Sequence, residues 1–119
     1  MDQRIISYLR PLRRRWGLTQ KELAFLIGAK SGGVISRIEG LKRVPSLAAA
    51  LACEIVFDTP PLELFPEIFS TMQDGVLDRA NDLYEELQGD PSRVTRAKLD
   101  FLEEMLARAH AHASSESIV

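Results

Sequence analysis

Residues 17–47 read GLTQKELAFLIGAKSGGVISRIEGLKRVPSL, and this stretch decides the fold of the first half of the chain. Thr19 and Glu22 form a capping box, which is the pattern that opens a helix, and apolar residues follow at helical spacing. Gly28 stands where that helix should end in a left-handed conformation, and Ser31 can cap the next helix. The stretch therefore predicts two short helices joined by a tight turn.

The flanking sequence predicts three further helices in the first half. An apolar stripe indicates a helix that ends before Gly17; it consists of Ile5, Leu9, Leu12 and Trp16. Trp16 is interpreted as a core residue. Pro45-Ser46 marks the start of the fourth helix, and Pro60-Pro61 suits the first turn of a short fifth helix. Cys53 lies on the apolar face of the fourth helix and is interpreted as an inert core residue.

The pattern changes after Pro66. Apolar residues spaced by three and four positions continue over residues 67–88 and predict one long amphipathic helix. Residues 89–92, Gly-Asp-Pro-Ser, are typical of a short connector, and a second long helical pattern follows them. Two long helices joined by so short a loop are expected to form an antiparallel hairpin.

These elements predict an all-α fold. We expect a five-helix helix-turn-helix domain at residues 1–65, a two-helix antiparallel hairpin at residues 66–113 and a flexible tail at residues 114–119. A chain of 119 residues is long enough for one small domain and an extension. The longest apolar run, residues 47–53, is too short to cross a bilayer, and the start of the chain does not resemble a secretory signal. With a single cysteine, the expected location is cytoplasmic.

Basic and acidic residues are divided unequally between the two halves. Residues 1–45 contain ten Lys and Arg residues against three acids, a net charge of +7. Residues 46–119 contain five Lys and Arg residues against fourteen acids, a net charge of −9. The asymmetry indicates either that the first half meets a polyanion such as nucleic acid, or that two surfaces of opposite sign attract each other.

Six short segments of the first half together carry a family resemblance. They are Gly17-Leu18-Thr19-Gln20, Glu22-Leu23-Ala24, Gly28, Ile35-Ser36-Arg37-Ile38-Glu39, Pro45-Ser46-Leu47 and Leu62-Glu63-Leu64-Phe65. As a set, they resemble the DNA-binding domain of the phage repressor/Cro type, also called the xenobiotic-response-element (XRE) family. The resemblance covers roughly residues 4–65. It implies that the helix after Gly28, the recognition helix, enters the major groove of DNA.

The resemblance also implies two sets of DNA contacts. Arg37 matches an outward-facing base-reading position, and its guanidinium suits O6 and N7 of guanine; the other base-reading candidates are Ser36, Lys30 and Ser31. Gln20 matches a phosphate-binding position at the start of a helix; the other phosphate candidates are Lys21, Lys42, Arg43 and Arg10. Arg13 is expected to form a structural ion pair with Glu39 rather than to contact DNA.

The chain departs from the family pattern at the start of the recognition helix. The spacing from Gly28 to Ile35 is one residue longer than in the common form. Gly32 and Gly33 fall where the family usually places base-reading side chains, and glycine supplies no such contact. Either the helix begins later, or the other base-reading candidates and the shape of the DNA carry the specificity.

Two hypotheses from different functional classes follow. The first is a sequence-specific transcriptional regulator that binds double-stranded DNA as a homodimer; the expected dimer interface consists of Phe69, Met72, Val76, Leu83, Leu87, Phe101 and Met105. The second is a protein-interaction adaptor, such as an antitoxin, whose acidic C-terminal helices bind a partner protein and whose DNA binding is secondary. No set of residues typical of a catalytic or metal site stands out, so we expect neither an enzyme nor a cofactor.

Overall fold

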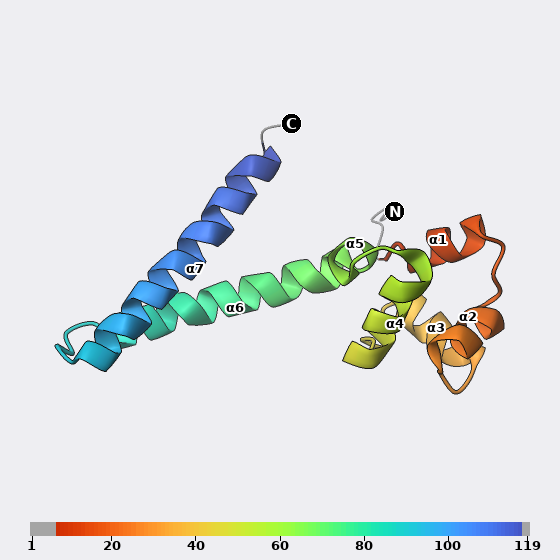
Figure 1. Ribbon diagram of the computed structural model, residues 1–119, viewed down its shortest axis with the longest axis horizontal. Coiled ribbons are helices and arrows are strands. Elements are labelled where there is room, and N and C mark those ends of the chain that lie inside the picture. Colours follow the sequence, from red (N-terminus) through yellow and green to blue (C-terminus); the bar gives the residue numbers. More distant parts are fainter. Residues whose placement is uncertain (1–6, 118–119) are drawn as a thin grey trace. The chain divides into compact units, whose positions relative to one another are not determined.

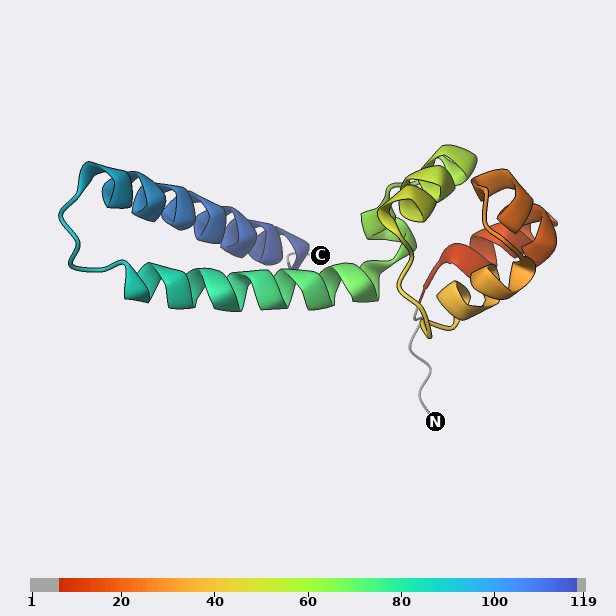
Figure 2. The ribbon, with the colours of Figure 1, turned by 90° about the horizontal axis from the view of Figure 1, so that it is seen from below.

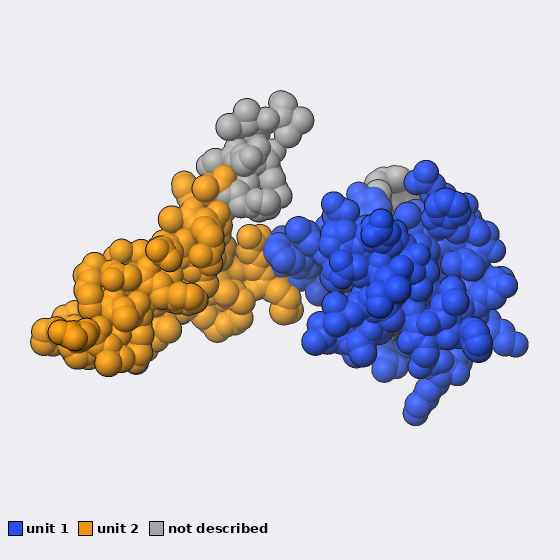
Figure 3. Space-filling view, viewed as in Figure 1, with its two compact units in different colours: residues 1–71 blue, residues 72–119 orange. Residues whose placement is uncertain are grey.

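The computed structural model describes residues 7–117, with side chains described up to residue 111. These residues form seven helices and no strand (Figure 1), which confirms the predicted all-α fold. The chain divides into two compact units, residues 1–71 and residues 72–119 (Figure 3). This division lies a few residues beyond the expected boundary at residue 65. None of the described helices has both the length and the apolar character needed to cross a membrane.

Five helices form the N-terminal domain; they are α1 (Leu9–Arg15), α2 (Gln20–Ile27), α3 (Gly32–Glu39), α4 (Leu47–Phe57) and α5 (Pro61–Leu64). Their boundaries follow local signals. The backbone N–H of Glu22 donates to Thr19 Oγ1 (3.0 Å) and the N–H of Thr19 donates to Glu22 Oε1 (2.8 Å), which confirms the capping box. Gly28 ends α2 with a left-handed φ of 75°. At the start of α4, the N–H of Ala49 donates to Ser46 Oγ.

The core of this domain receives side chains from all five helices. Its buried members are Leu9, Leu23, Ala24, Ile35, Ile38, Cys53, Leu64 and Phe65. Ile68 packs against this core, so the first turn of the next helix belongs with the N-terminal unit. The side chain of Cys53 is 1% exposed, and burial raises the pKa of its thiol from 9.0 to about 11. Cys53 is therefore a buried core residue with an unreactive thiol, as predicted.

The prediction that Trp16 lies in the core is wrong. Its side chain is 68% exposed, and the guanidinium carbon of Arg15 lies 5.8 Å from the centre of its ring. Leu9 and Leu12 do pack in or against the core. Trp16 is the C-cap of α1, and its backbone N–H still donates to the carbonyl of Leu12, so the spacing places its backbone correctly although its ring lies in solvent. Ile5, the remaining member of the stripe, lies outside the described residues.

Two long helices follow, α6 (Pro66–Glu86) and α7 (Arg93–Ser117). The connector at residues 87–92 joins them, and their chain directions are antiparallel (Figure 2). Their axes diverge with distance from the connector (Figure 1). The predicted bounds of α6 were residues 67–88, so the helix begins one residue earlier and ends two residues earlier than predicted. α7 continues through Ser117, so the first part of the expected flexible tail is helical. Residues 118 and 119 lie outside the described part of the chain.

The seam between the hairpin helices is buried near the connector. Its buried residues are Ala80 on α6 and Thr95, Leu99 and Leu102 on α7. The hydroxyl of Tyr84 donates to Glu103 Oε1 over 2.7 Å and links the two helices. Farther from the connector, Met105 is only half-buried. The two helices alone therefore leave part of their apolar surface uncovered.

Candidate nucleic-acid interface

α2 and α3 form the helix-turn-helix, and small residues allow them to approach closely. Ala24 on α2 is 2% exposed. A Cβ atom at Gly32 would lie 3.2 Å from the backbone nitrogen of Lys21 and 3.4 Å from the carbonyl carbon of Gln20. Because the backbone cannot give way easily, glycine at position 32 lets the start of α3 rest on the first turn of α2. The recognition helix begins at Gly32, so the alternative in which it begins after both glycines is wrong.

The carboxylate of Glu39, at the end of α3, accepts hydrogen bonds from α1 and α2. Arg13 donates from Nε to Oε2 over 2.7 Å and from Nη2 to Oε1 over 3.1 Å. Their side chains are 8% and 0% exposed, so this is a buried ion pair. Oε1 also accepts from Arg10 Nε (3.3 Å) and from Gln20 Nε2 (3.1 Å). The structure thus places Arg13 and Glu39 as expected, and adds Arg10 and Gln20 to the pair.

This network keeps Glu39 charged. Burial on its own would raise the pKa of Glu39, because a carboxylate loses its hydration. Hydrogen bonds from Arg13, Gln20 and Arg10, together with the charge of Arg13, outweigh that effect and hold the pKa below its ordinary value of 4.5. The charged carboxylate therefore connects α1, α2 and α3, which is a structural role rather than a contact to DNA.

Two residues predicted to contact phosphate take part in this network. The side-chain nitrogen of Gln20 donates one hydrogen bond to Glu39, and its second N–H can still donate to a phosphate. The backbone N–H of Gln20, at the start of α2, has no acceptor within the helix and can bind the same phosphate. The side chain of Arg10 remains 48% exposed. Sequence reasoning missed both bonds, since the partners lie 19 and 29 residues from Glu39 along the chain.

The other candidate DNA contacts are exposed and surround α3. They are Lys21 on α2, Lys30 and Ser31 in the turn after α2, Ser36 and Arg37 on α3, and Lys42 and Arg43 in the loop after α3. The backbone N–H groups of Lys42 and Arg43 donate to the carbonyl of Arg37 over 2.9 and 3.3 Å. These bonds hold the loop against the end of α3. Between residues 20 and 43 the only exposed acid is Glu22.

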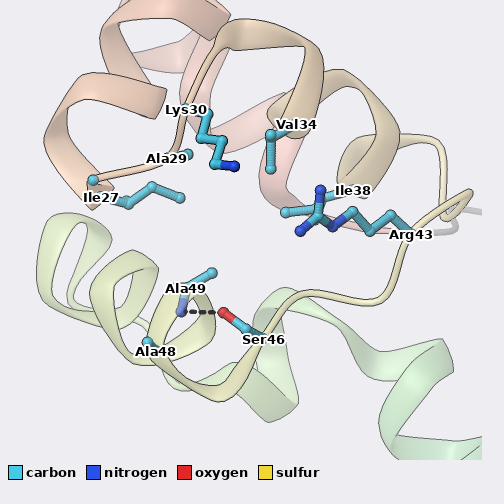
Figure 4. A pocket seen from close by; sticks show the side chains of 10 residues that line it. Ile27, Ala29, Lys30, Val34, Ile38, Arg43, Ser46, Ala48 and Ala49 are labelled. Atoms are coloured by element: carbon cyan, nitrogen blue, oxygen red, sulfur yellow. Dashed lines mark hydrogen bonds between the residues drawn. The ribbon is translucent and has the colours of Figure 1, made fainter.

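Two clefts bring some of these cations together. In the cleft between the turn after α2 and the start of α4, the charged ends of Lys30 and Arg43 point inward beside apolar side chains such as Val34 (Figure 4). A second cleft, at the start of α3, is lined by Lys21 and Lys30 among other residues. Because Lys30 lines both clefts, Lys21, Lys30 and Arg43 form one surface, which we call the basic surface.

Comparison with known families agrees with this geometry. Residues 9–64 match the family model described as Helix-turn-helix. No curated protein and no solved structure matches the chain significantly. The match begins with α1 and ends with α5, and thus covers the five helices that build the core and the basic surface. It confirms the family resemblance: residues 9–64 form a DNA-binding helix-turn-helix domain that belongs to the repressor/Cro (XRE) family.

Proposed function

We propose that the chain is a transcriptional regulator that binds specific double-stranded DNA sites as a homodimer. The observation that carries this proposal is the basic surface of Lys21, Lys30 and Arg43 beside the exposed face of α3, where Ser36 and Arg37 lie. A surface of this charge next to a recognition helix attracts the phosphates that border the major groove. The fourteen acids of residues 46–119 follow α3 in the chain, and none of them lies on α2 or α3.

Arg37 is the principal base-reading residue in this proposal. Its side chain is exposed on α3, and its guanidinium can donate two parallel hydrogen bonds to O6 and N7 of guanine. Ser36 on the same helix, with Lys30 and Ser31 in the preceding turn, adds contacts to neighbouring bases. Few side chains then read the sequence directly, so the shape of the DNA contributes to the choice of site.

Phosphate contacts hold the domain on the DNA at both ends of α3. Lys42 and Arg43 are fixed beside the end of α3 by their bonds to the carbonyl of Arg37. Lys21 and the backbone N–H of Gln20 lie at the start of α2, where the helix dipole adds positive charge. Such contacts position a protein on DNA without reading its sequence.

The hairpin supplies the dimer interface in this proposal. Five of the seven residues expected there are exposed, namely Phe69, Met72, Val76, Leu83 and Phe101, while Leu87 and Met105 are half-buried. Val76 and Met105 line one groove, so apolar side chains of both helices meet on the same face. A second hairpin would cover this face. A dimer that reads two half-sites then needs its two recognition helices about 34 Å apart, which is one turn of DNA.

A titration of the purified protein with random-sequence duplex at low and moderate salt tests DNA binding. The logarithm of the affinity should fall linearly with the logarithm of salt concentration, by about 0.9 per phosphate contact. Lys42→Ala and Arg43→Ala should weaken binding to all sequences equally and flatten this slope. Arg93→Ala, which removes an exposed arginine from α7, should change neither quantity. A wild-type slope that Lys42→Ala leaves unchanged would contradict its role as a phosphate contact.

A protein-interaction adaptor is the second candidate function. Four exposed carboxylates follow one another at four-residue spacing along α6, namely Asp74, Asp78, Asp82 and Glu86. This spacing puts them in one row, which suits a partner with a basic surface. If the wild-type protein binds no duplex even at low salt, the regulator proposal fails and the adaptor is favoured.

A further inference from the structure

The two glycines that open α3 have different surroundings. Gly32 is needed by the packing of α3 on α2, because a Cβ atom there would press on backbone atoms. A Cβ atom at Gly33 would meet only side-chain atoms, Ser31 Oγ at 3.4 Å and Arg37 Nη1 at 3.8 Å, which are ordinary contacts. Gly33 is exposed, and its backbone is not in the left-handed region. The fold therefore does not require glycine at position 33, although glycine is unfavourable in a helix.

The guanidinium of Arg37 lies beside Gly33. The two residues are four positions apart, so they share one face of α3. A long helical side chain points toward the start of its helix, and the 3.8 Å distance shows that Arg37 reaches back a full turn. Among residues 7–111, no carboxylate forms an ion pair with Arg37. Its hydrogen-bond donors are therefore available at the first turn of α3.

We propose that Gly33 is a specificity-determining positioning residue. Glycine here leaves open the space in which the Arg37 guanidinium lies, at the first turn of the recognition helix, and a side chain longer than that of alanine would fill this space. Base contacts of such helices come mainly from that first turn. One arginine from the next turn thus supplies the contact that side chains at positions 32 and 33 cannot make. At this position Arg37 recognises a G·C base pair by donating to O6 and N7 of guanine. This inference rests on the proposed DNA binding.

A size series at position 33, combined with Arg37→Ala, tests the inference. One duplex is selected from genomic fragments by the wild-type protein, and the other has random sequence. The measured quantity, called the preference, is the affinity for the selected duplex divided by the affinity for the random duplex at the same salt concentration. Gly33→Ala should retain the preference, because its Cβ atom leaves the guanidinium in place. Gly33→Leu should displace the guanidinium and lower the preference roughly 5- to 100-fold, as should Arg37→Ala. The double variant should lose no more than either single variant.

The control is Gly40→Ala, which adds a methyl group at the other end of α3. Its Cβ atom would lie 3.5 Å from the carbonyl oxygen of Ser36, an ordinary contact away from the Arg37 guanidinium, so the preference should not change. Independent losses from Gly33→Leu and Arg37→Ala, an unchanged preference in Gly33→Leu, or failure of Gly33→Leu to fold would each overturn the inference.

Wild-type results distinguish this inference from the function on which it depends. Wild-type protein that binds DNA with normal salt dependence but prefers no duplex would overturn the inference and leave DNA binding intact. Wild-type protein that binds no duplex even at low salt would overturn the proposed function, and the inference with it.

Discussion

At the scale of single residues, the carboxylate of Glu39 connects three helices of the N-terminal domain, because it accepts hydrogen bonds from α1 and α2. Glu39→Gln would keep the shape of the side chain but leave the buried Arg13 guanidinium without an opposite charge. We expect the free energy of unfolding to fall by about 3–5 kcal/mol, measured by urea denaturation. Glu63→Gln, an exposed substitution on α5, is the control and should change it by less than about 0.5 kcal/mol. Equal stability of Glu39→Gln and wild type would contradict the prediction.

Because the pKa of Glu39 is lowered in the folded state, the stability of the domain should decrease at acidic pH. A carboxyl group whose pKa is lower in the folded state adds stability that is complete above the unfolded value, near 4.5, and is lost as pH falls through the folded value. The stability advantage of the wild type over Glu39→Gln should therefore shrink as pH falls from about 5 to 3. Thermal unfolding of both proteins at stepped pH measures this. A constant difference across the range would argue against it.

At the scale of elements, the helix boundaries that sequence predicted well are those set by residues within one turn. The bonds of Thr19 and Glu22 span three residues, and Gly28 needs only its own backbone conformation to end α2. The end of α7 was predicted less well, because residues 109–117 contain neither glycine nor proline to stop the helix.

Features that join distant residues were harder to predict. The Arg13–Glu39 pair could be expected because the family resemblance supplied it, whereas the bond from Gln20 to Glu39 could not. A long polar side chain at the start of a helix can reach several acceptors, and the packing of α1, α2 and α3 decides among them. The exposure of Trp16 was not predicted either, because helical spacing places a backbone position but does not show whether other elements cover the side chain.

The contact between α2 and α3 predicts opposite effects for two neighbouring substitutions. Gly32→Ala would press a methyl group on the backbone of Lys21, so we expect it to destabilise the domain by about 1–3 kcal/mol. Gly33→Ala has room for its methyl group and should leave stability unchanged or raise it by up to about 1 kcal/mol. Denaturant midpoints of the two variants measure the difference. A Gly32→Ala variant that is as stable as Gly33→Ala would show that the two helices can separate without cost.

At the scale of the whole molecule, the exposed apolar face of the hairpin predicts a dimer that charge can disrupt. Phe101→Asp would place a carboxylate in the proposed interface, where a second copy would have to bury it. Analytical ultracentrifugation at micromolar concentration should give a dimer for the wild type and a monomer for this variant. Ala107→Asp adds the same charge at another exposed position of α7 and should remain dimeric. A monomeric wild type would contradict the proposed dimer, and a dimeric Phe101→Asp variant would exclude Phe101 from its interface.

Chemical labelling of the Cys53 thiol can measure how often the N-terminal unit unfolds. Alkylating reagents react with an accessible thiolate. In the folded domain, Cys53 is buried and its pKa is about 11, so it does not present an accessible thiolate to these reagents. Modification must then proceed through molecules whose first unit has opened, and its rate measures the free energy of that opening. Since Cys53 is the sole cysteine of the chain and lies in the first unit, labelling reads the stability of the DNA-binding domain without a signal from the hairpin.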